Sequence, residues 1–404
     1  MPDYKTLDFF LNLFAICLVV LPIYWATTKT ALRRFLLIAT TGTLLYSIAP
    51  RLLVFYIFFW LVVSFICWVN LVSRDKRLSG WLLGLSITLL LLPLVLWRIF
   101  EFEFVKQFNL ITNHLTGYLG DDIAMVDISR WVVIPLGLSF AAFRAIDLLI
   151  QTNLGIESPK FRQIFSYGFF PTIQIVGPIS EFREIEPSIA RSRADQKELW
   201  SPNLVLLTKG LFKVLIVSTL LQPSAAILSN WQGMESWILL ANLVLYMFYF
   251  YFNFSGFSDI AVSFAGFFGF QISNNFNRPF LQQNPQAFWN SWHMSLTSFM
   301  RRNVFVPLGG FRKERELFAV MVTMLAVALW HGLTVPLVLF GLYHGSGIII
   351  WRLWSRSHAP REGLLPRVAR TASTFAFVAL AMPLMTLKLQ DIPSFYSALL
   401  GFSS

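Results

Sequence analysis

The sequence predicts an all-α polytopic membrane protein that forms a single membrane domain over residues 1–404. Of the 404 residues, 56% are hydrophobic and only 13% are charged, whereas a soluble domain carries about 25% charged residues. So few charges cannot cover a water-facing surface of this size, and the apolar surplus must therefore face lipid. Apolar stretches of about 20 residues, the length that a membrane-spanning helix needs, recur along the chain.

The first 150 residues are expected to cross the membrane repeatedly, at about 8–27, 31–49, 52–73, 79–100 and 131–150. The loops after the first and third of these spans carry basic residues, and the stretch after the fourth is mostly acidic. Because Lys and Arg concentrate in cytoplasmic loops, the N-terminus is expected outside the cytoplasm. The same rule explains the net charge of +11 as a topology signal, which disfavours nucleic-acid binding. The first apolar run lacks the basic leader and cleavage site of a signal peptide, so a spanning helix is expected there.

Beyond residue 160 the pattern is less regular. Residues 164–180 are apolar but contain Pro171, Gly177 and Pro178, which favours a re-entrant segment shielded by protein. Residues 181–200 mix both charges and are expected to form a surface loop. Further spans are expected at about 203–228, 235–252, 256–272, 317–334, 335–354 and 370–388. The total is roughly eleven spanning or re-entrant segments.

Histidines supply the clearest chemical signal. His331 follows an apolar run, and an ionisable residue at membrane depth generally faces the protein interior or a cavity. A neutral imidazole there can accept a proton near neutral pH, which makes His331 a candidate general base. The alternative is a histidine that is hydrogen-bonded between helices. His344 has small neighbours, Gly341 and Gly345, and a structural role in helix packing is favoured for it.

His293 belongs to a Trp-rich segment. On a helix, Trp289, Trp292 and Leu296 would share one face near it, which predicts an amphipathic helix at the membrane interface. The alternative is a headgroup-level histidine without a special role. No metal site is expected, because no histidine pair has metal-ligand spacing and no cysteine lies nearby.

Two polar segments interrupt the apolar pattern between the spans, at residues 253–261 and 274–280. Their Asn and Gly content favours structured turns, with helix capping as the alternative. Asp259 lies beside an apolar run, so its carboxylate is expected to have a partner or to face a cavity.

In their order along the chain, these motifs resemble the membrane-bound O-acyltransferase (MBOAT) family. The likeness is greatest to its bacterial branch of alginate O-acetylation and DltB D-alanyl transfer proteins. The collinear motifs run from about residue 134 to 345. They are Pro-Leu-Gly-Leu-Ser-Phe at 135–140, Phe-Pro at 170–171, Gly-Pro-Ile at 177–179, Phe-Arg-Glu at 182–184, Phe-Ser-Gly-Phe-Ser-Asp at 254–259, Asn-Phe-Asn-Arg-Pro-Phe at 275–280, Trp-His-Met-Ser-Leu at 292–296, Pro-Leu-Gly-Gly at 307–310 and Leu-Trp-His-Gly at 329–332.

The resemblance implies an MBOAT fold around a central tunnel, with His331 as the catalytic histidine and His293 as the second key residue. It further implies acyl transfer from a cytoplasmic thioester, either acyl-carrier phosphopantetheine or acetyl-CoA, with no tightly bound cofactor. The acceptor would be an extracytoplasmic glycopolymer, reached directly or through a companion acyltransferase, and the location the bacterial cytoplasmic membrane. Residues expected to bind substrate or line the tunnel are Asn253, Ser255, Asp259, Asn277, Arg278, Trp289, Trp292 and Trp330.

Two departures from the family pattern concern the site. Arg301-Arg302-Asn303 stands where the family often has Arg-Asp-Tyr, and Asn253 stands where Asp is common. The acyl group, D-alanyl or acetyl, is left open. One alternative function is a transporter or flippase, although the paired repeats common in transporters are not found. Another is a non-catalytic scaffold subunit of an acylation complex, and Arg302 and Asn303 lend it weight.

Overall fold

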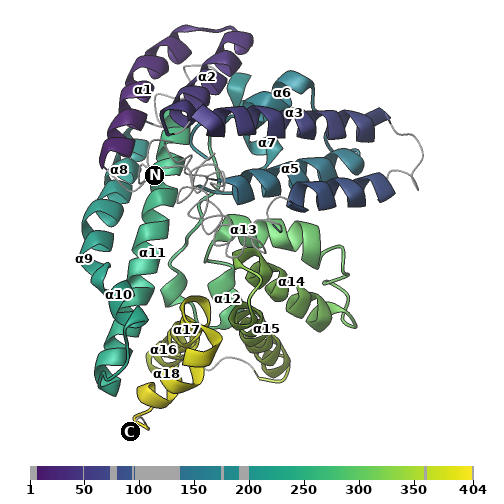
Figure 1. Ribbon diagram of the computed structural model, residues 1–404. Helices are drawn as coiled ribbons and strands as arrows, with labels where there is room; N and C mark the ends of the chain where they lie inside the picture. Colours follow the sequence, from purple (N-terminus) through teal and green to yellow (C-terminus); the bar gives the residue numbers. More distant parts are fainter. Residues whose placement is uncertain are drawn as a thin grey trace, which may run out of the picture. The chain divides into compact units, whose positions relative to one another are not determined.

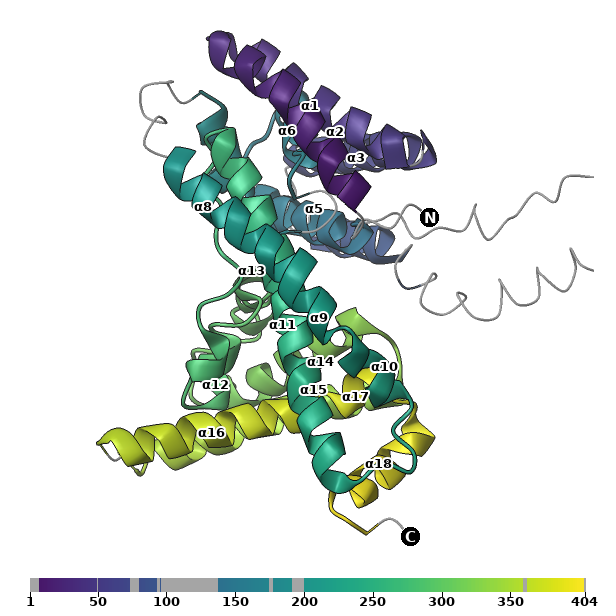
Figure 2. The same ribbon diagram turned by 90° about the vertical axis from the view of Figure 1, so that its left-hand side faces the viewer.

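The computed structural model describes residues 7–48, 50–72, 80–92, 95, 137–173, 177–190, 200–358 and 362–402. Most of these residues are helical, and the only β-pairing among them is an isolated bridge between Phe276 and Trp292. The all-α expectation is therefore confirmed. The chain forms two compact units (Figures 1 and 2), one of Met1–Ile175 with Glu181–Ala190 and the other of Val176–Ser180 with Arg191–Ser404.

Among the described residues, five helices are long and apolar enough to cross a membrane. They are Leu52–Val72, Trp200–Leu221, Ser236–Phe267, Val335–Ser355 and Leu364–Thr386, and shorter apolar helices cover Asn12–Ala26, Gly80–Leu92 and Glu316–His331. Large apolar side chains such as Phe58 and Trp237 are exposed on them, as lipid-facing residues should be. The multi-pass architecture is thus confirmed, whereas the total of roughly eleven segments stays a prediction. The acidic stretch at 101–130, with His114, lies outside the described residues.

The first unit is built around a buried arginine. Its helices are α1 (Leu7–Ala26), α2 (Thr30–Ile48), α3 (Pro50–Val72), α5 (Leu138–Asn153), α6 (Phe161–Gly168) and α7 (Phe182–Ile185). Arg144 of α5 is fully buried and donates hydrogen bonds to the backbone carbonyls of Tyr167 (2.9 Å) and Gly168 (3.2 Å). Its guanidinium also lies over the Trp60 ring of α3. These bonds satisfy carbonyls at the end of α6, where the helix has no partners of its own.

The prediction of a surface loop for residues 181–200 is wrong for the first half of this segment. Residues 181–190 form α7 and a 3₁₀ turn, with Ile185 and Ile189 buried. The charges of this segment are matched from α2: Arg34 forms a bidentate pair with Glu186, and Arg33 donates to the Ile189 carbonyl at 3.2 Å. Because its polar groups have partners, the segment can bury its apolar face. Residues 191–199 lie outside the described part.

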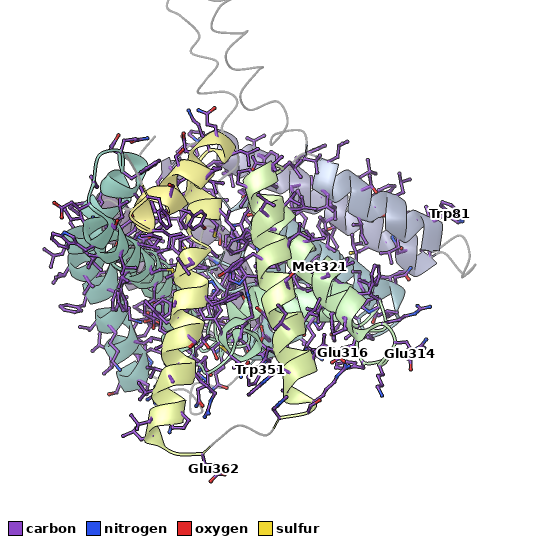
Figure 3. All side chains as sticks on the ribbon, turned by 90° about the horizontal axis from the view of Figure 1, so that it is seen from below. Trp81, Glu314, Glu316, Met321, Trp351 and Glu362 are labelled. Atoms are coloured by element: carbon purple, nitrogen blue, oxygen red, sulfur yellow. The ribbon has the colours of Figure 1, made fainter. Side chains whose placement is uncertain are left out.

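The second unit contains the remaining helices. They are α8 (Trp200–Leu211), the π-helical segment η4 (Phe212–Ser218), α9 (Thr219–Leu221), α10 (Pro223–Ser229), α11 (Ser236–Phe267), α12 (Pro285–Trp289), α13 (Met294–Met300), the π-helical segment η6 (Arg301–Phe305), α14 (Glu316–His331), α15 (Val335–Ser355), α16 (Leu364–Leu380), α17 (Pro383–Thr386) and α18 (Ile392–Leu399). Helices α14 and α15 form a hairpin, as the spans expected at 317–334 and 335–354 require. Glu316, which Figure 3 labels at the start of α14, pairs with Arg352 and Arg356 at the end of α15.

Helix α11 corrects one sequence interpretation. The two spans expected at 235–252 and 256–272, with a turn between them, are one helix of 32 residues that runs beside α8 and α9 (Figures 1 and 2). Its polar residues find partners on the neighbouring helix segment: Asn253 donates to the Ser218 hydroxyl (3.0 Å), and Asp259 pairs with Lys213 (2.6 Å). A polar group with a partner inside the bundle does not have to end a helix.

Close packing of α11 against α8 depends on two glycines. A Cβ added to Gly256 would lie 2.9 Å from the carbonyl oxygen of Gly210, and a Cβ on Gly210 would lie 2.9 Å from that of Gly256. Small residues at such crossings let helix backbones approach in membranes. A side chain at either position would push the two helices apart.

We therefore expect Gly256→Val to destabilise the protein by about 1–3 kcal/mol, the usual effect of overpacking. Thermal unfolding of the purified protein in detergent measures this. Gly84→Val is the matched control, because a Cβ on helical Gly84 meets no atom within 4 Å. Equal melting temperatures for the two variants would contradict the importance of this crossing.

Candidate active site

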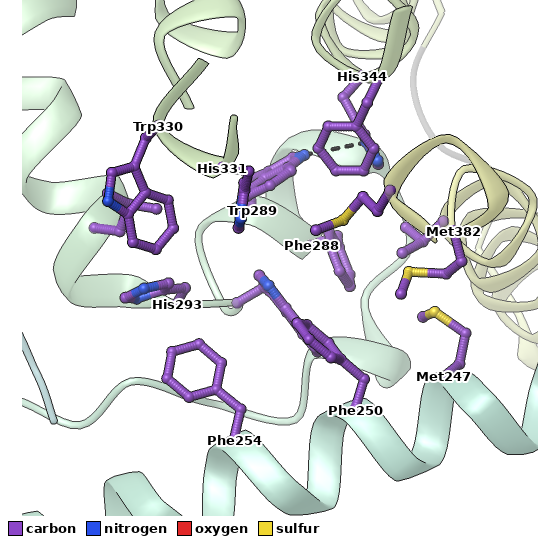
Figure 4. Close-up of a pocket in the computed structure, with 15 residues that line it drawn as sticks. Met247, Phe250, Phe254, Phe288, Trp289, His293, Trp330, His331, His344 and Met382 are labelled. Atoms are coloured by element: carbon purple, nitrogen blue, oxygen red, sulfur yellow. Dashed lines mark hydrogen bonds between the residues drawn. The ribbon is translucent and has the colours of Figure 1, made fainter. Parts of the chain in front are cut away.

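A cavity of about 130 Å³ lies inside the second unit and is lined by side chains from α11 through α17 (Figure 4). This is room for roughly four water molecules or one small acyl group. Its walls are aromatic and thioether side chains, and its polar lining consists of Trp and His rings. Three histidines reach it from three different segments of the chain: His293, His331 and His344.

His293 corrects a second sequence interpretation. Instead of lying on one amphipathic helix with Trp289 and Trp292, it is the left-handed residue (φ 45°) at which the chain turns from α12 into α13. Trp289 and Trp292 are 7% and 9% exposed, so they belong to the core and not to an interface. The turn is held by a backbone hydrogen bond from Met294 N to the Asn275 carbonyl (2.9 Å). Helical periodicity concerns only residues close in sequence and therefore does not predict this contact.

The surroundings of His293 keep its ring neutral. The ring meets Phe254 edge-on, at 4.7 Å between centroids, and Trp330 at 5.7 Å. Burial, and secondarily the nearby His331, lower the pKa of His293 to about 3. At neutral pH this imidazole is therefore an uncharged group that can both donate and accept hydrogen bonds.

His331 is the last residue of α14, at the cavity wall. Its ring lies 4.5 Å from that of Trp330 and 6.4 Å from that of Phe340. Because Trp330 also contacts His293, this indole packs against both histidines that the sequence singled out (Figure 4).

His344 reaches the same cavity from α15, although the sequence favoured a packing role for it. The ring is 1% exposed, and its Nδ1 accepts a hydrogen bond from the indole N–H of Trp289 at 3.3 Å. The signal that could have marked it is the one that marked His331, an ionisable side chain at membrane depth.

Asn275 is a second residue that sequence reasoning did not place in the site. Its side chain is buried, donates to the Ser258 hydroxyl of α11 (2.8 Å) and accepts from the Ser295 hydroxyl of α13 (2.6 Å). The Ser295 hydroxyl oxygen in turn accepts from the backbone N–H of Ile179 (2.9 Å). This buried network joins α11, α13 and the 177–180 segment next to the His293 turn. Its sequence signal was present in the Asn-Phe-Asn-Arg motif.

The sequence model of the membrane-bound O-acyltransferase (MBOAT) family matches residues 9–382. The chain belongs to this family. It is 29% identical over 260 residues to the probable alginate O-acetylase AlgI of Pseudomonas fluorescens, a match that covers 62% of this chain and 50% of the relative. The peptidoglycan O-acetyltransferase of Helicobacter pylori is 26% identical, with 62% and 53% covered. The teichoic acid D-alanyltransferase of Streptococcus thermophilus is 26% identical, with 80% and 75% covered.

The chain spans about half the length of the alginate O-acetylases that it matches. The family match extends from α1 through α16 and therefore includes every residue that lines the cavity except Met385 of α17. Family membership and the apolar helices together establish a multi-pass membrane protein.

The structure brings together the two expected catalytic histidines of this MBOAT protein and three of the eight residues expected to bind substrate or line the tunnel. Besides His293 and His331, the cavity is lined by Trp289, Trp292 and Trp330. It is not lined by the remaining five, which are Asn253, Ser255, Asp259, Asn277 and Arg278. The first three lie within α11, where Asn253 and Asp259 bind neighbouring helix segments, and the last two are exposed. Their role at a tunnel stays a prediction.

Proposed function

We propose that the protein transfers a short acyl group from a cytoplasmic thioester donor to hydroxyl groups of an extracytoplasmic cell-envelope glycopolymer. The observation that carries the proposal is the meeting of His293, His331 and His344 at one small, buried, otherwise apolar cavity. A neutral imidazole in an apolar site can take a proton from a hydroxyl group and can donate a hydrogen bond to a carbonyl oxygen. Acyl transfer needs both of these functions. The named relatives, two kinds of O-acetylase and a D-alanyltransferase, act in the same class of chemistry.

In this mechanism His331 is the general base. Its ring takes the proton of the acceptor hydroxyl as the oxygen attacks the thioester carbonyl, and the carbonyl electron pair moves onto oxygen. When the tetrahedral intermediate collapses, the C–S bond breaks and the proton passes to the leaving thiolate. His293 orients the acceptor or polarises the carbonyl. Exclusion of water from the aromatic cavity limits hydrolysis of the donor.

An acetyl group fits this cavity better than D-alanyl does. Among the residues that the structure describes, no Asp or Glu lines the cavity, and a buried ammonium without a carboxylate partner is costly. The methyl group of acetyl would instead contact apolar side chains such as Met247 and Met382. The thioester donor would accordingly be acetyl-CoA or an acetylated carrier.

D-alanyl transfer is the second candidate, favoured by one observation. The Streptococcus thermophilus D-alanyltransferase aligns with 80% of this chain, whereas the alginate O-acetylase of Pseudomonas fluorescens aligns with 62%. Aromatic faces such as that of Trp292 could partly compensate an ammonium group.

The proposed setting is the bacterial cytoplasmic membrane, with the N-terminus outside the cytoplasm as the positive-inside bias predicts. A carrier of the acyl donor would bind on the cytoplasmic side. On the opposite side the partner would be the glycopolymer itself or a companion acyltransferase that completes the transfer.

Identification of ester-linked acyl groups in the purified cell envelope tests this function. Mild alkali releases them from wild type, a deletion strain and the complemented deletion, and mass spectrometry names them. We expect one acyl species, acetate, to disappear in the deletion and to return on complementation. Loss of D-alanine instead would select the second candidate. An unchanged ester content would overturn acyl transfer and favour a transporter or flippase.

A further inference from the structure

His344 sits in a surrounding that would suit a hydrocarbon ring. Its imidazole is packed among the rings of Phe340, Phe377, Trp289 and Tyr343, with centroids at 4.4, 5.2, 5.2 and 5.6 Å. Placing a polar ring among aromatic side chains is unfavourable unless its nitrogens make hydrogen bonds. The role of His344 therefore depends on the hydrogen bonds that its two ring nitrogens make.

One of these nitrogens is fixed by Trp289. An indole N–H can only donate, so the 3.3 Å contact from Trp289 Nε1 requires that His344 Nδ1 accepts and carries no proton. In a neutral imidazole the proton then lies on Nε2. Among the described residues Nε2 has no hydrogen-bond partner, and the ring lines the cavity together with His293 and His331 (Figure 4).

We propose that His344 is a third catalytic histidine, whose Nε2–H donates a hydrogen bond to the acyl carbonyl oxygen as negative charge develops on it, and that Trp289 is the positioning residue that fixes this tautomer. The inference rests on the proposed acyl transfer. His344 transfers no proton: the carbonyl electron pair moves to the oxygen, the hydrogen bond stabilises it, and collapse of the intermediate restores the carbonyl. The base and the donor are thus separate residues on the two helices of one hairpin.

Two replacements of His344 distinguish this role from packing. Phenylalanine keeps a ring in the aromatic surrounding but removes both nitrogens. Glutamine loses the ring, but its amide can accept from Trp289 through Oε1 and donate through Nε2. A donor role predicts more activity in His344→Gln than in His344→Phe, whereas a packing role predicts the reverse order.

The readout is alkali-releasable acetate per purified envelope, with D-alanine measured in parallel, in the deletion strain complemented at matched membrane levels of protein. We expect His344→Phe to lose about 100-fold, as removal of one oxyanion donor does elsewhere, and His344→Gln to retain at least a tenth of wild-type activity. Trp289→Phe, which keeps an aromatic ring in the cavity wall but removes the indole N–H, is expected to fall between them. His358→Phe is the control at an exposed histidine.

The outcomes separate this inference from the function on which it rests. If the wild-type gene restores no ester, the proposed function itself fails. If it restores ester but His344→Phe is as active as His344→Gln or more so, the donor role is overturned and acyl transfer stands. Should both His344 variants be lost from the membrane, Trp289→Phe decides: wild-type activity in that variant overturns the tautomer argument, and a loss of tenfold or more supports it.

Discussion

Replacement of His331 by alanine is expected to lower ester formation by about 100- to 10,000-fold, the range that a general base contributes. His331 ends α14 at the cavity wall, where its ring lies against those of Trp330 and Phe340. Alanine at a helix end should therefore leave the α14–α15 hairpin intact while removing the proton acceptor. Alkali-releasable acetate and D-alanine, normalised to the amount of protein in the membrane, measure the effect.

Replacement of His358 by alanine supplies the matched control. This histidine follows α15, is exposed and contacts the Trp354 carbonyl through Nδ1. We expect the His358→Ala variant to keep full activity at the same membrane level. Restoration of the ester by His331→Ala would remove the base assignment, and a scaffold role for the chain would then be the better account.

Apolar runs were sufficient to predict an all-α, multi-pass membrane protein, and the sequence also singled out five residues that line one cavity. The α14–α15 hairpin lies where the two spans were expected, because each is an uninterrupted apolar run. His331, His293 and three tryptophans meet at one cavity. The resemblance to the family implied these five positions, and His331 was also marked as an ionisable residue at membrane depth.

The errors in predicting where helices begin and end share one physical cause. Local sequence does not show the distant partners with which polar residues form hydrogen bonds or ion pairs. Asn253 and Asp259 do not break α11, since Ser218 and Lys213 satisfy them from a neighbouring segment. His293 does break a helix, because the backbone at Asn275 binds the next residue. Each of these contacts joins residues at least 19 positions apart, which local periodicity does not register.

Replacement of Asn275 by leucine is expected to destabilise the protein, although Asn275 does not line the cavity. Leucine has nearly the same shape but leaves the buried hydroxyls of Ser258 and Ser295 without the amide that binds both. Unsatisfied buried polar groups of this kind cost about 1–3 kcal/mol each, so we expect destabilisation of about 2–4 kcal/mol. Thermal unfolding in detergent measures it.

Activity should fall further than stability alone explains, because the Asn275 backbone and side chain hold the first residues of α13 directly after His293. A displacement of about 1 Å at a catalytic group can lower rates about 100-fold. Asn274→Leu is the matched control, the same substitution at the preceding, exposed position. If the two variants form equal amounts of ester per folded protein, the network stabilises the unit without positioning His293. A selective loss in Asn275→Leu would make this network part of the catalytic machinery.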